Sequence, residues 1–226
     1  NGMPLSRCSP QFNLSTNMIT LGMTGLCAFI GLFEIGRPLP GDAVAVSAAA
    51  GGVGSIAIQL AKIAGCKTIG VAGGPRKTAV LREKLGVEIA LDYKNTDLAS
   101  HLGSAAPKGI NVFFDNVGGD VLDAVLINLA KFGRVAVCGG IGGYDKAETV
   151  VRNTTLLTQK NGLVQGFWYS DYEHIFERAL DSMSDWIRSG ELQEFTDVAK
   201  GFDSVPRSVR GIFAGENLGK QLVELS

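Results

Sequence analysis

The stretch that decides the fold is Ser47-Ala-Ala-Ala-Gly-Gly-Val-Gly-Ser-Ile-Ala-Ile-Gln-Leu-Ala-Lys62. The apolar run at 42–47 predicts a short buried strand, and from Val53 onward apolar residues recur at helical spacing. A strand, a glycine-rich turn and a helix in this order allow backbone N–H groups at the helix start to meet a phosphate. Gly51, Gly52 and Gly54 lack a Cβ atom, so a pyrophosphate can approach the backbone closely. The stretch therefore predicts a dinucleotide-binding turn, although one glycine run alone is a weak signal.

Short apolar runs alternate with helical patterns through the middle of the chain. The runs are nearly continuous, as in strands buried on both faces, and predict strands at 43–46, 68–72, 88–91, 110–114 and 134–138. Helices are predicted between them, at 53–64, 76–85, 95–102 and 119–131. This alternation predicts βαβ units in a doubly wound parallel sheet, which is an α/β Rossmann fold with three αβα layers.

The chain is expected to divide into three parts. They are an irregular leading segment (1–17), the cofactor domain (18–190) and a C-terminal segment (191–226). One helix is predicted at 18–35, interrupted or weakened at its glycines. Later elements are predicted as a strand at 163–167, an amphipathic helix at 171–189, a short strand-like piece, a helix near 204–214 and a final strand at 220–225.

Charge, hydropathy and cysteine usage exclude several classes of protein. The 226 residues carry a formal net charge of -1, which argues against a nucleic-acid partner. The most apolar stretch, 18–35, contains glycines and ends in a Gly-Arg-Pro break, so it predicts a buried helix and no membrane association. The four cysteines are scattered, without a C-x-x-C pair or a nearby histidine, so neither a zinc site nor a disulfide framework is expected. This usage indicates a reducing compartment, and we expect the cytoplasm.

The residues after the second predicted strand distinguish the two nicotinamide cofactors. An NAD site usually has an Asp or Glu here that accepts hydrogen bonds from the ribose hydroxyls. This chain has Ala72-Gly-Gly-Pro-Arg-Lys77, with no carboxylate between Val71 and Leu81. Arg76 and Lys77 suit a 2′-phosphate, so NADPH is favoured over NADH. The alternative is two solvated charges at a helix start, where the helix dipole does not favour cations.

Three further strand ends carry small or polar residues. They are Asp92-Tyr-Lys-Asn95, Asp115-Asn-Val-Gly-Gly119 and Cys138-Gly-Gly-Ile-Gly-Gly-Tyr144. Ordinary turn chemistry explains any one of them. Parallel strands bring their carboxyl ends to one edge of the sheet, however, so the four strand ends together predict a ligand cleft there. No G-x-S-x-G or H-E-x-x-H motif occurs, which leaves hydrolase and zinc-protease interpretations without support.

Motifs spread over nearly the whole chain resemble those of the medium-chain dehydrogenase/reductase superfamily. The resemblance is strongest to its zinc-free leukotriene/prostaglandin reductase branch, which reduces alkenals and enones with NADPH. The aromatic run Phe167-Trp-Tyr169 departs from that branch, which leaves the substrate open. The matching motifs are Ala48-Ala-Ala-Gly-Gly-Val-Gly54, Gly86 with Leu91-Asp-Tyr-Lys94, Phe114-Asp-Asn-Val-Gly-Gly119, Lys131-Phe-Gly-Arg134, Cys138-Gly-Gly-Ile-Gly-Gly-Tyr144 and Gly215-Glu-Asn-Leu-Gly-Lys220.

The resemblance implies a role for residues in each motif. The pyrophosphate would be held by Gly51, Gly52, Val53 and Gly54. The 2′-phosphate end would be held by Lys77 and Tyr93. Arg76 is added to this second group because of its charge and its position in the sequence. The other residues implied to contact the cofactor are Asn116, Cys138, Gly139, Gly140, Ile141, Tyr144, Val164, Gln165, Gly166 and Asn217. Tyr144 is also the candidate catalytic residue, because its hydroxyl suits an enolate oxygen. No metal ligand is expected.

The resemblance also implies an activity, a further domain and an assembly. The expected activity is NADPH-dependent hydride transfer to the β-carbon of an α,β-unsaturated aldehyde or ketone. Two alternatives are a quinone reductase of the same superfamily and a non-catalytic NADPH-binding sensor or scaffold protein. A GroES-like domain is expected ahead of this chain, with the C-terminal segment returning to it, and the protein is expected to form a homodimer.

Overall fold

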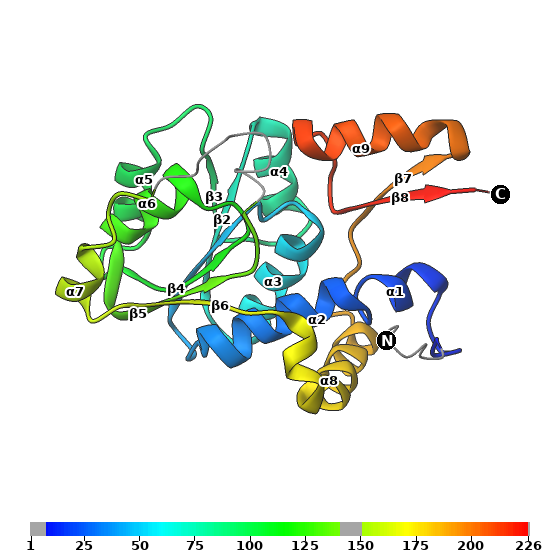
Figure 1. Ribbon diagram of the computed structural model, residues 1–226, viewed down its shortest axis with the longest axis horizontal. Coiled ribbons are helices and arrows are strands. Elements are labelled where there is room, and N and C mark those ends of the chain that lie inside the picture. The colour runs from blue at the N-terminus through cyan, green and yellow to red at the C-terminus, as the bar shows by residue number, and fades with distance from the viewer. Residues whose placement is uncertain (1–7, 141–150, 226) are drawn as a thin grey trace.

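The core of the molecule is a parallel sheet of six strands in the order β3-β2-β1-β4-β5-β6, seen here in a computed structural model (Figure 1). The structure describes residues 8–140 and 151–225. The strands are β1 (Ala43–Ser47), β2 (Lys67–Ala72), β3 (Ile89–Asp92), β4 (Ile110–Asp115), β5 (Leu129–Val137) and β6 (Leu163–Gly166). β1 lies at the centre, where Ala45 is level with Ile69 of β2 and Phe113 of β4. The order reverses between β1 and β4, so the predicted doubly wound Rossmann fold is confirmed.

Helices cover both faces of this sheet and create two hydrophobic cores. One core packs α2 (Met23–Phe29), the π-helix η1 (Ile30–Gly36), α3 (Gly52–Ile63), α4 (Pro75–Glu83) and α8 (Phe176–Ser189) against one face. The other packs α5 (Leu98–Ala105), α6 (Gly119–Ile127) and α7 (Leu156–Lys160) against the opposite face. Phe114 faces the first core and Phe113 the second, and both are fully buried, as period-2 alternation in a central strand requires. The three predicted αβα layers are therefore present.

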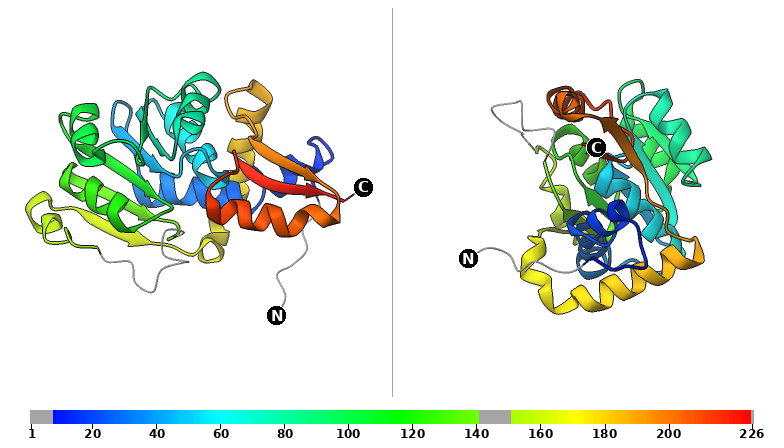
Figure 2. Two further views of the ribbon diagram at one scale, coloured as in Figure 1. Left: turned by 90° about the horizontal axis from the view of Figure 1, so that it is seen from above. Right: turned by 90° about the vertical axis from the view of Figure 1, so that its right-hand side faces the viewer.

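The C-terminal segment forms a second, two-stranded parallel sheet beside the first. It contains β7 (Thr196–Lys200), the 3-10 helix η4 (Phe202–Ser204), α9 (Val205–Ala214) and β8 (Lys220–Glu224) (Figures 1 and 2). The amide of Gly219 donates to the carbonyl of Ala50 at 2.7 Å, which joins this sheet to the glycine-rich turn. The buried side chain of Gln59 exchanges two hydrogen bonds with the backbone of Gln193. These contacts hold the C-terminal segment against the glycine-rich turn and α3.

The helix predicted at 18–35 is wrong in its boundaries. The chain forms α1 (Leu14–Met18) inside the supposedly irregular segment, turns at 19–22, and continues as α2 and η1. At the turn, the amides of Gly22 and Gly25 donate to the carbonyl of Ile19, and a Cβ atom on Gly25 would collide with the carbonyl of Thr20. Among the described residues, no helix is long and apolar enough to cross a membrane.

The predicted helix at 119–131 is also too long, because α6 ends at Ile127 and β5 begins at Leu129. The side-chain amide of Asn128, the residue between α6 and β5, donates to the carbonyls of Ala99 and Ala124 and so holds this turn in place. Leu129 is therefore a buried strand residue paired with Ile110, and does not belong to the apolar stripe of a helix. The amphipathic pattern at 171–189 likewise divides into the 3-10 helix η3 (Tyr169–Ile175) and α8.

Candidate cofactor-binding site

The glycine-rich turn adopts the geometry that the sequence predicts. The chain leaves β1 through Ala48, whose φ of 46° is left-handed, and the amide of Gly51 donates to the carbonyl of Ala48 at 2.8 Å. α3 begins immediately afterwards, so its first N–H groups, which have no partner within the helix, face the end of the sheet. These groups and the positive end of the helix dipole form an anion-binding position.

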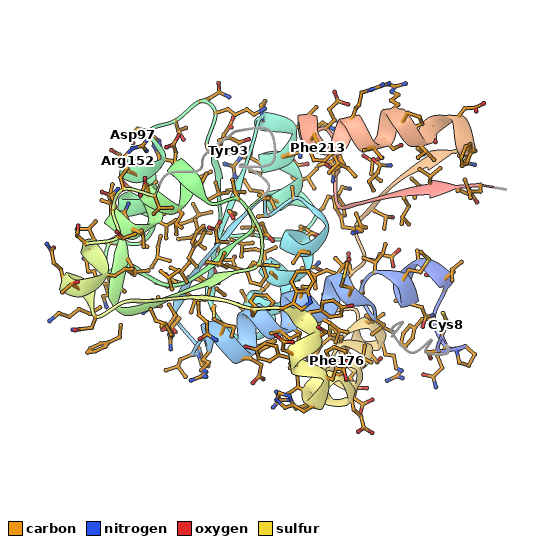
Figure 3. All side chains as sticks on the ribbon, viewed as in Figure 1. Cys8, Tyr93, Asp97, Arg152, Phe176 and Phe213 are labelled. Carbon is orange, nitrogen blue, oxygen red and sulfur yellow. The ribbon has the colours of Figure 1, made fainter. Side chains whose placement is uncertain are left out.

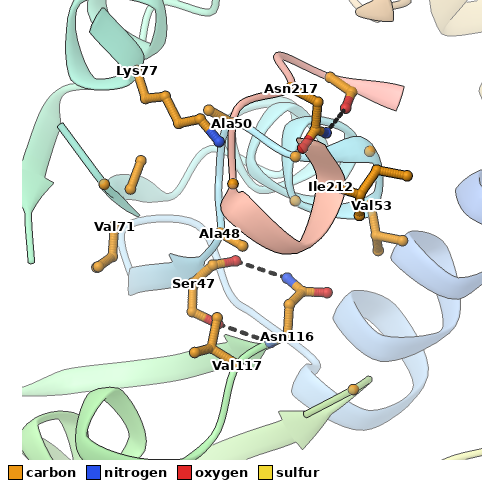
Figure 4. A pocket seen from close by; sticks show the side chains of 18 of the residues that line it. Ser47, Ala48, Ala50, Val53, Val71, Lys77, Asn116, Val117, Ile212 and Asn217 are labelled. Atoms are coloured by element: carbon orange, nitrogen blue, oxygen red, sulfur yellow. Dashed lines mark hydrogen bonds between the residues drawn. The ribbon is translucent and has the colours of Figure 1, made fainter. Parts of the chain in front are cut away.

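A cleft of about 580 Å³ opens above this turn at the carboxyl ends of the strands. The close view in Figure 4 shows Lys77 reaching from α4 toward Ala50, with Asn116 and Asn217 entering from other segments. Tyr93 and Phe213 lie at the same end of the molecule in Figure 3, and both line the cleft. The cleft therefore lies between the six-stranded sheet and the C-terminal segment.

Cations gather at the corner of the cleft next to β2 and β3. Lys77 is half-buried, and burial, followed by the charges of Lys94 and Arg76, lowers the pKa of its ammonium group, while Asp197 opposes this. Among the described residues, none of these three cations lies within ion-pair distance of a carboxylate. Bringing several cations together without a neutralising carboxylate is unfavourable, and a bound anion would relieve it.

Asp92, which ends β3 at that corner, is hydrogen-bonded mainly to the local backbone. It accepts hydrogen bonds from the amides of Gly74 at 2.8 Å and Lys94 at 3.1 Å, and from the side-chain amide of Asn95 at 2.6 Å. The Gly74 bond is the main cause that holds the pKa of Asp92 below its usual range. Asp92 therefore shapes the turn before α4, and its hydrogen-bonding capacity is largely used there.

A buried carboxylate, Asp115, organises the opposite corner of the cleft. One of its oxygens accepts from the Ser47 hydroxyl at 2.9 Å and from the amides of Val117 and Gly118, each at 3.0 Å. Its backbone carbonyl accepts from the amide of Cys138 at 2.8 Å. Burial is the leading cause that raises the pKa of Asp115, and these hydrogen bonds oppose it. Asp115 thus joins the ends of β1, β4 and β5, and these ends carry three walls of the cleft.

Replacing Asp115 with alanine is expected to lower the free energy of unfolding by about 3 kcal/mol, because the Ser47 hydroxyl and two amides lose a buried acceptor. The same substitution should also weaken NADPH binding. Chemical denaturation and cofactor titration measure the two effects. The matched control is Asp120→Ala, since Asp120 is exposed and its surface pair with Arg152 contributes little. Equal stability of the two variants would contradict this role for Asp115.

Most of the predicted site residues meet in this cleft. Those that line it are Gly51, Gly52, Val53, Gly54, Lys77, Tyr93, Asn116, Cys138, Gly139, Gly140 and Asn217. Arg76 does not line the cleft, although its charge acts on Lys77. Val164, Gln165 and Gly166 lie on β6 beside the end of β5, outside the cleft lining. Ile141 and Tyr144 fall outside the described residues.

Two lysines of the cleft were not predicted as site residues. Lys94 and Lys220 both line it, and the Lys220 side chain lies about 3.0 Å from the position that a Cβ on Gly52 would take. Each ends a motif quoted above, so the signal was present in the sequence. The approach of Lys220 to the glycine turn depends on the C-terminal sheet, which the sequence does not place in space. The apolar wall from α9, formed by Ile212 and Phe213, was missed for the same reason.

The fold and this cleft define a nucleotide-binding domain, and comparison with known proteins gives its family. Residues 52–185 match the family model described as zinc-binding dehydrogenase, so the chain belongs to this family and to the medium-chain dehydrogenase/reductase superfamily. Within the part of the chain that the structure describes, no group of three His, Cys, Asp or Glu side chains is placed to hold a metal ion.

Particular relatives narrow this assignment. The chain is 42% identical to a putative NADP-dependent oxidoreductase, YfmJ, of Bacillus subtilis, with 91% of this chain and 62% of the relative covered. It is 41% identical to the NADP⁺-dependent 2-alkenal reductase of Nicotiana tabacum, covering 91% of this chain and 61% of that protein. The crystal structure of CurA with NADPH from Vibrio vulnificus superposes with a TM-score of 0.89 at 33% identity, over 94% of this chain and 65% of CurA. These descriptions agree with the predicted cofactor, NADP(H), and with an oxidoreductase. The chain spans less than two thirds of the length of each relative.

Proposed function

We propose that the protein containing this chain is an NADPH-dependent reductase of the carbon–carbon double bond in α,β-unsaturated aldehydes and ketones. The observation that carries the proposal is the corner where Lys77 and Lys94 line the cleft with the charge of Arg76 nearby. These cations suit a 2′-phosphate, and the carboxylate that ends β3, Asp92, is held by local hydrogen bonds. The 41% identity to a 2-alkenal reductase supports the acceptor class.

The residues of the cleft fit NADPH in charge. The start of α3 provides N–H groups for the pyrophosphate, and Lys220 adds a cation beside them. Tyr93 packs over Gly73, where a Cβ atom would come within 3.0 Å of its ring, and it lines the same cleft as Lys77. The chain therefore offers separate positions for the pyrophosphate and the 2′-phosphate.

Bound at this site, NADPH would supply the hydride that the β-carbon of the acceptor receives. The backbone amide and the side-chain amide of Asn116 both donate to Ser47 at 2.8 Å, so this side chain is fixed at the wall of the cleft, where we expect it to orient a ligand. We place the nicotinamide end near Cys138–Gly140 and beside 164–166. Tyr144, which lies outside the described residues, is our candidate for holding the enolate oxygen while the α-carbon is protonated.

The acceptor class is tested with the purified full-length protein, NADPH and a matched panel of acceptors. An alkenal and an enone should support NADPH oxidation and yield products saturated at the carbon–carbon bond, whereas the corresponding saturated ketone should not react. Absence of turnover with every enone of the panel would contradict the proposal.

The same panel separates the two alternatives. Turnover of quinones without turnover of enones would identify a quinone reductase. Tight NADPH binding without turnover of any acceptor would identify a sensor or scaffold protein. Zinc independence is tested in the same assay, since activity should persist after dialysis against a chelator.

We also propose a homodimer formed through the edge of the sheet. β6 pairs with β5, and among the described residues no strand lies on its other side. Leu163 of β6 is 48% exposed, and an exposed apolar edge strand is a template for pairing with another chain. Light scattering should show a dimer for the wild type and a monomer for Leu163→Lys. A monomeric wild type would contradict this assembly.

The C-terminal segment carries the proposal of an upstream domain. Phe202 on η4, Val209 on α9 and Leu225 directly after β8 are each about half exposed or more. These exposed apolar side chains are suited to contact with another folded part. We propose that the GroES-like domain of the full-length protein packs here. For the whole protein we propose the cytoplasm, because the four cysteines are free thiols.

A further inference from the structure

The C-terminal segment carries a lysine directly onto the glycine-rich turn. Lys220 begins β8, and its Cα, Cβ and Cδ atoms lie 3.5, 3.5 and 3.0 Å from the position that a Cβ on Gly52 would take. The preceding residue, Gly219, donates its amide to the carbonyl of Ala50 at 2.7 Å and forms a parallel bridge with Gly51. Main-chain contacts to two residues of the turn therefore hold Lys220 at the start of α3.

Two further hydrogen bonds fix the bend that precedes β8. The amide of Lys220 donates to the carbonyl of Phe195 at 2.9 Å, which ties the start of β8 to the residue before β7. The side-chain amide of Asn217 donates to the carbonyl of Gly219 at 2.7 Å (Figure 4). The main-chain position of Lys220 is therefore set by its own segment as well as by the turn that it contacts.

Within the part of the chain that the structure describes, the ammonium group of Lys220 has no carboxylate at ion-pair distance. Lys220 lines the cofactor cleft, and the first N–H groups of α3 beside it have no partner within the helix. A cation near the positive end of a helix dipole is unfavourable, so an anion bound between the two would relieve both. The doubly charged diphosphate of a dinucleotide suits this position.

Few buried side chains hold the C-terminal segment in place. After Leu192, no side chain of the described residues is buried. β7, η4, α9 and β8 pack chiefly against one another, and β8 also contacts α3. Segments with few buried apolar contacts open locally at a low cost in free energy. A ligand that contacts both this segment and α3 would oppose such opening, because it binds only the closed arrangement.

We propose that Lys220 binds the diphosphate of NADPH, and that this contact ties the C-terminal segment to the glycine-rich turn when the cofactor is bound. Lys220 supplies the charge from β8, and the N–H groups at the start of α3 supply hydrogen bonds. Ile212 and Phe213 of α9 line the same cleft, so the same contact holds this apolar wall against the cofactor. The inference rests on the cofactor of the proposed function and not on its acceptor.

The first experiment titrates the full-length wild type and Lys220→Met with NADPH and with NADH. Methionine keeps an unbranched apolar side chain over Gly52 and removes the charge. Both cofactors contain the diphosphate, so both affinities should fall by about tenfold or more, whereas Lys220→Arg should retain most of the binding. The matched control is Lys200→Met on β7, since Lys200 is 85% exposed and pairs only with Glu224, at 3.8 Å. Its affinities should equal those of the wild type.

The second experiment measures hydrogen exchange of the same proteins, without cofactor and saturated with NADPH. In the wild type, NADPH should slow exchange both at the start of α3 and in peptides from 205–224. In Lys220→Met, saturating NADPH should still protect α3, but the protection of 205–224 should be lost. Lys200→Met should behave like the wild type. Lys220→Gln is measured beside Lys220→Met, so that a folding defect in one variant does not decide the result.

The outcomes that overturn this inference differ from those that overturn the proposed function. A loss of NADPH affinity with unchanged NADH affinity would assign Lys220 to the 2′-phosphate, and unchanged affinity for both cofactors would remove the contact altogether. Protection of 205–224 in Lys220→Met equal to that in the wild type would overturn the tie between segment and turn. A wild type that binds NADPH and reduces no enone overturns the acceptor class alone, and one that binds neither cofactor overturns both proposals.

Discussion

Lys77→Ala should weaken NADPH binding by about tenfold to a hundredfold and leave NADH binding nearly unchanged. The contact that we propose joins a half-buried ammonium group to a phosphate, and hydrogen bonds to charged groups contribute about 1.5–3 kcal/mol. NADH has no 2′-phosphate, so its affinity should change by less than about twofold. Titration of each cofactor against the two proteins measures both affinities.

The control for this comparison is Lys84→Ala at the other end of α4. Lys84 is exposed and follows the last residue of that helix, so its removal changes the net charge by the same amount without touching the cleft. Equal losses of NADPH and NADH affinity in Lys77→Ala would contradict the 2′-phosphate assignment. A loss of NADPH affinity in Lys84→Ala as large as in Lys77→Ala would point to the overall charge of the protein. Raising the salt concentration should reduce the difference in NADPH affinity between the wild type and Lys77→Ala, because salt screens the attraction between the ammonium group and the phosphate.

Local sequence patterns were sufficient to predict the sheet and one side of the site. Strands buried on both faces read as continuous apolar runs, and each is followed directly by the residues that line the cleft. Residues at 51–54, 77, 93, 116 and 138 therefore meet where the order of strands reverses. This part could be predicted because each residue is placed by the strand immediately before it.

The other side of the site depends on contacts between distant segments. Lys220 reaches the glycine turn through the bond from Gly219 to Ala50, and Gln59 of α3 bonds to the backbone of Gln193. Hydrophobic periodicity predicts neither of these contacts. The same holds for the break at 19–22, where the amides of Gly22 and Gly25 donate to the carbonyl of Ile19. Helical periodicity alone could not reveal it, because apolar residues continue through the break.

Gly54→Ala should destabilise the fold by about 3 kcal/mol and also reduce NADPH binding by at least about tenfold. A Cβ atom on Gly54 would collide with the carbonyl oxygen of Ala48 and would lie 2.9 Å from the Cα of Ala49. Both neighbours are backbone, and Ala48 is already fixed in a left-handed conformation, so the start of α3 must move away from β1. Overpacking of a close contact costs about 1–3 kcal/mol, and a contact made of backbone lies at the upper end. The N–H groups proposed to hold the pyrophosphate move with the helix.

Gly52→Ala is the matched control, because it adds the same methyl group to the same turn of α3. Its Cβ would meet the flexible side chain of Lys220, with Cδ at 3.0 Å, and this side chain can move aside. Both substitutions gain the same helix propensity from alanine, so that contribution cancels in the comparison. Denaturation should therefore show a loss for Gly54→Ala and a change below about 1 kcal/mol for Gly52→Ala, although both variants bind NADPH less tightly. If the two variants unfolded at the same denaturant concentration, the close approach of α3 to Ala48 would not be what holds this turn in place.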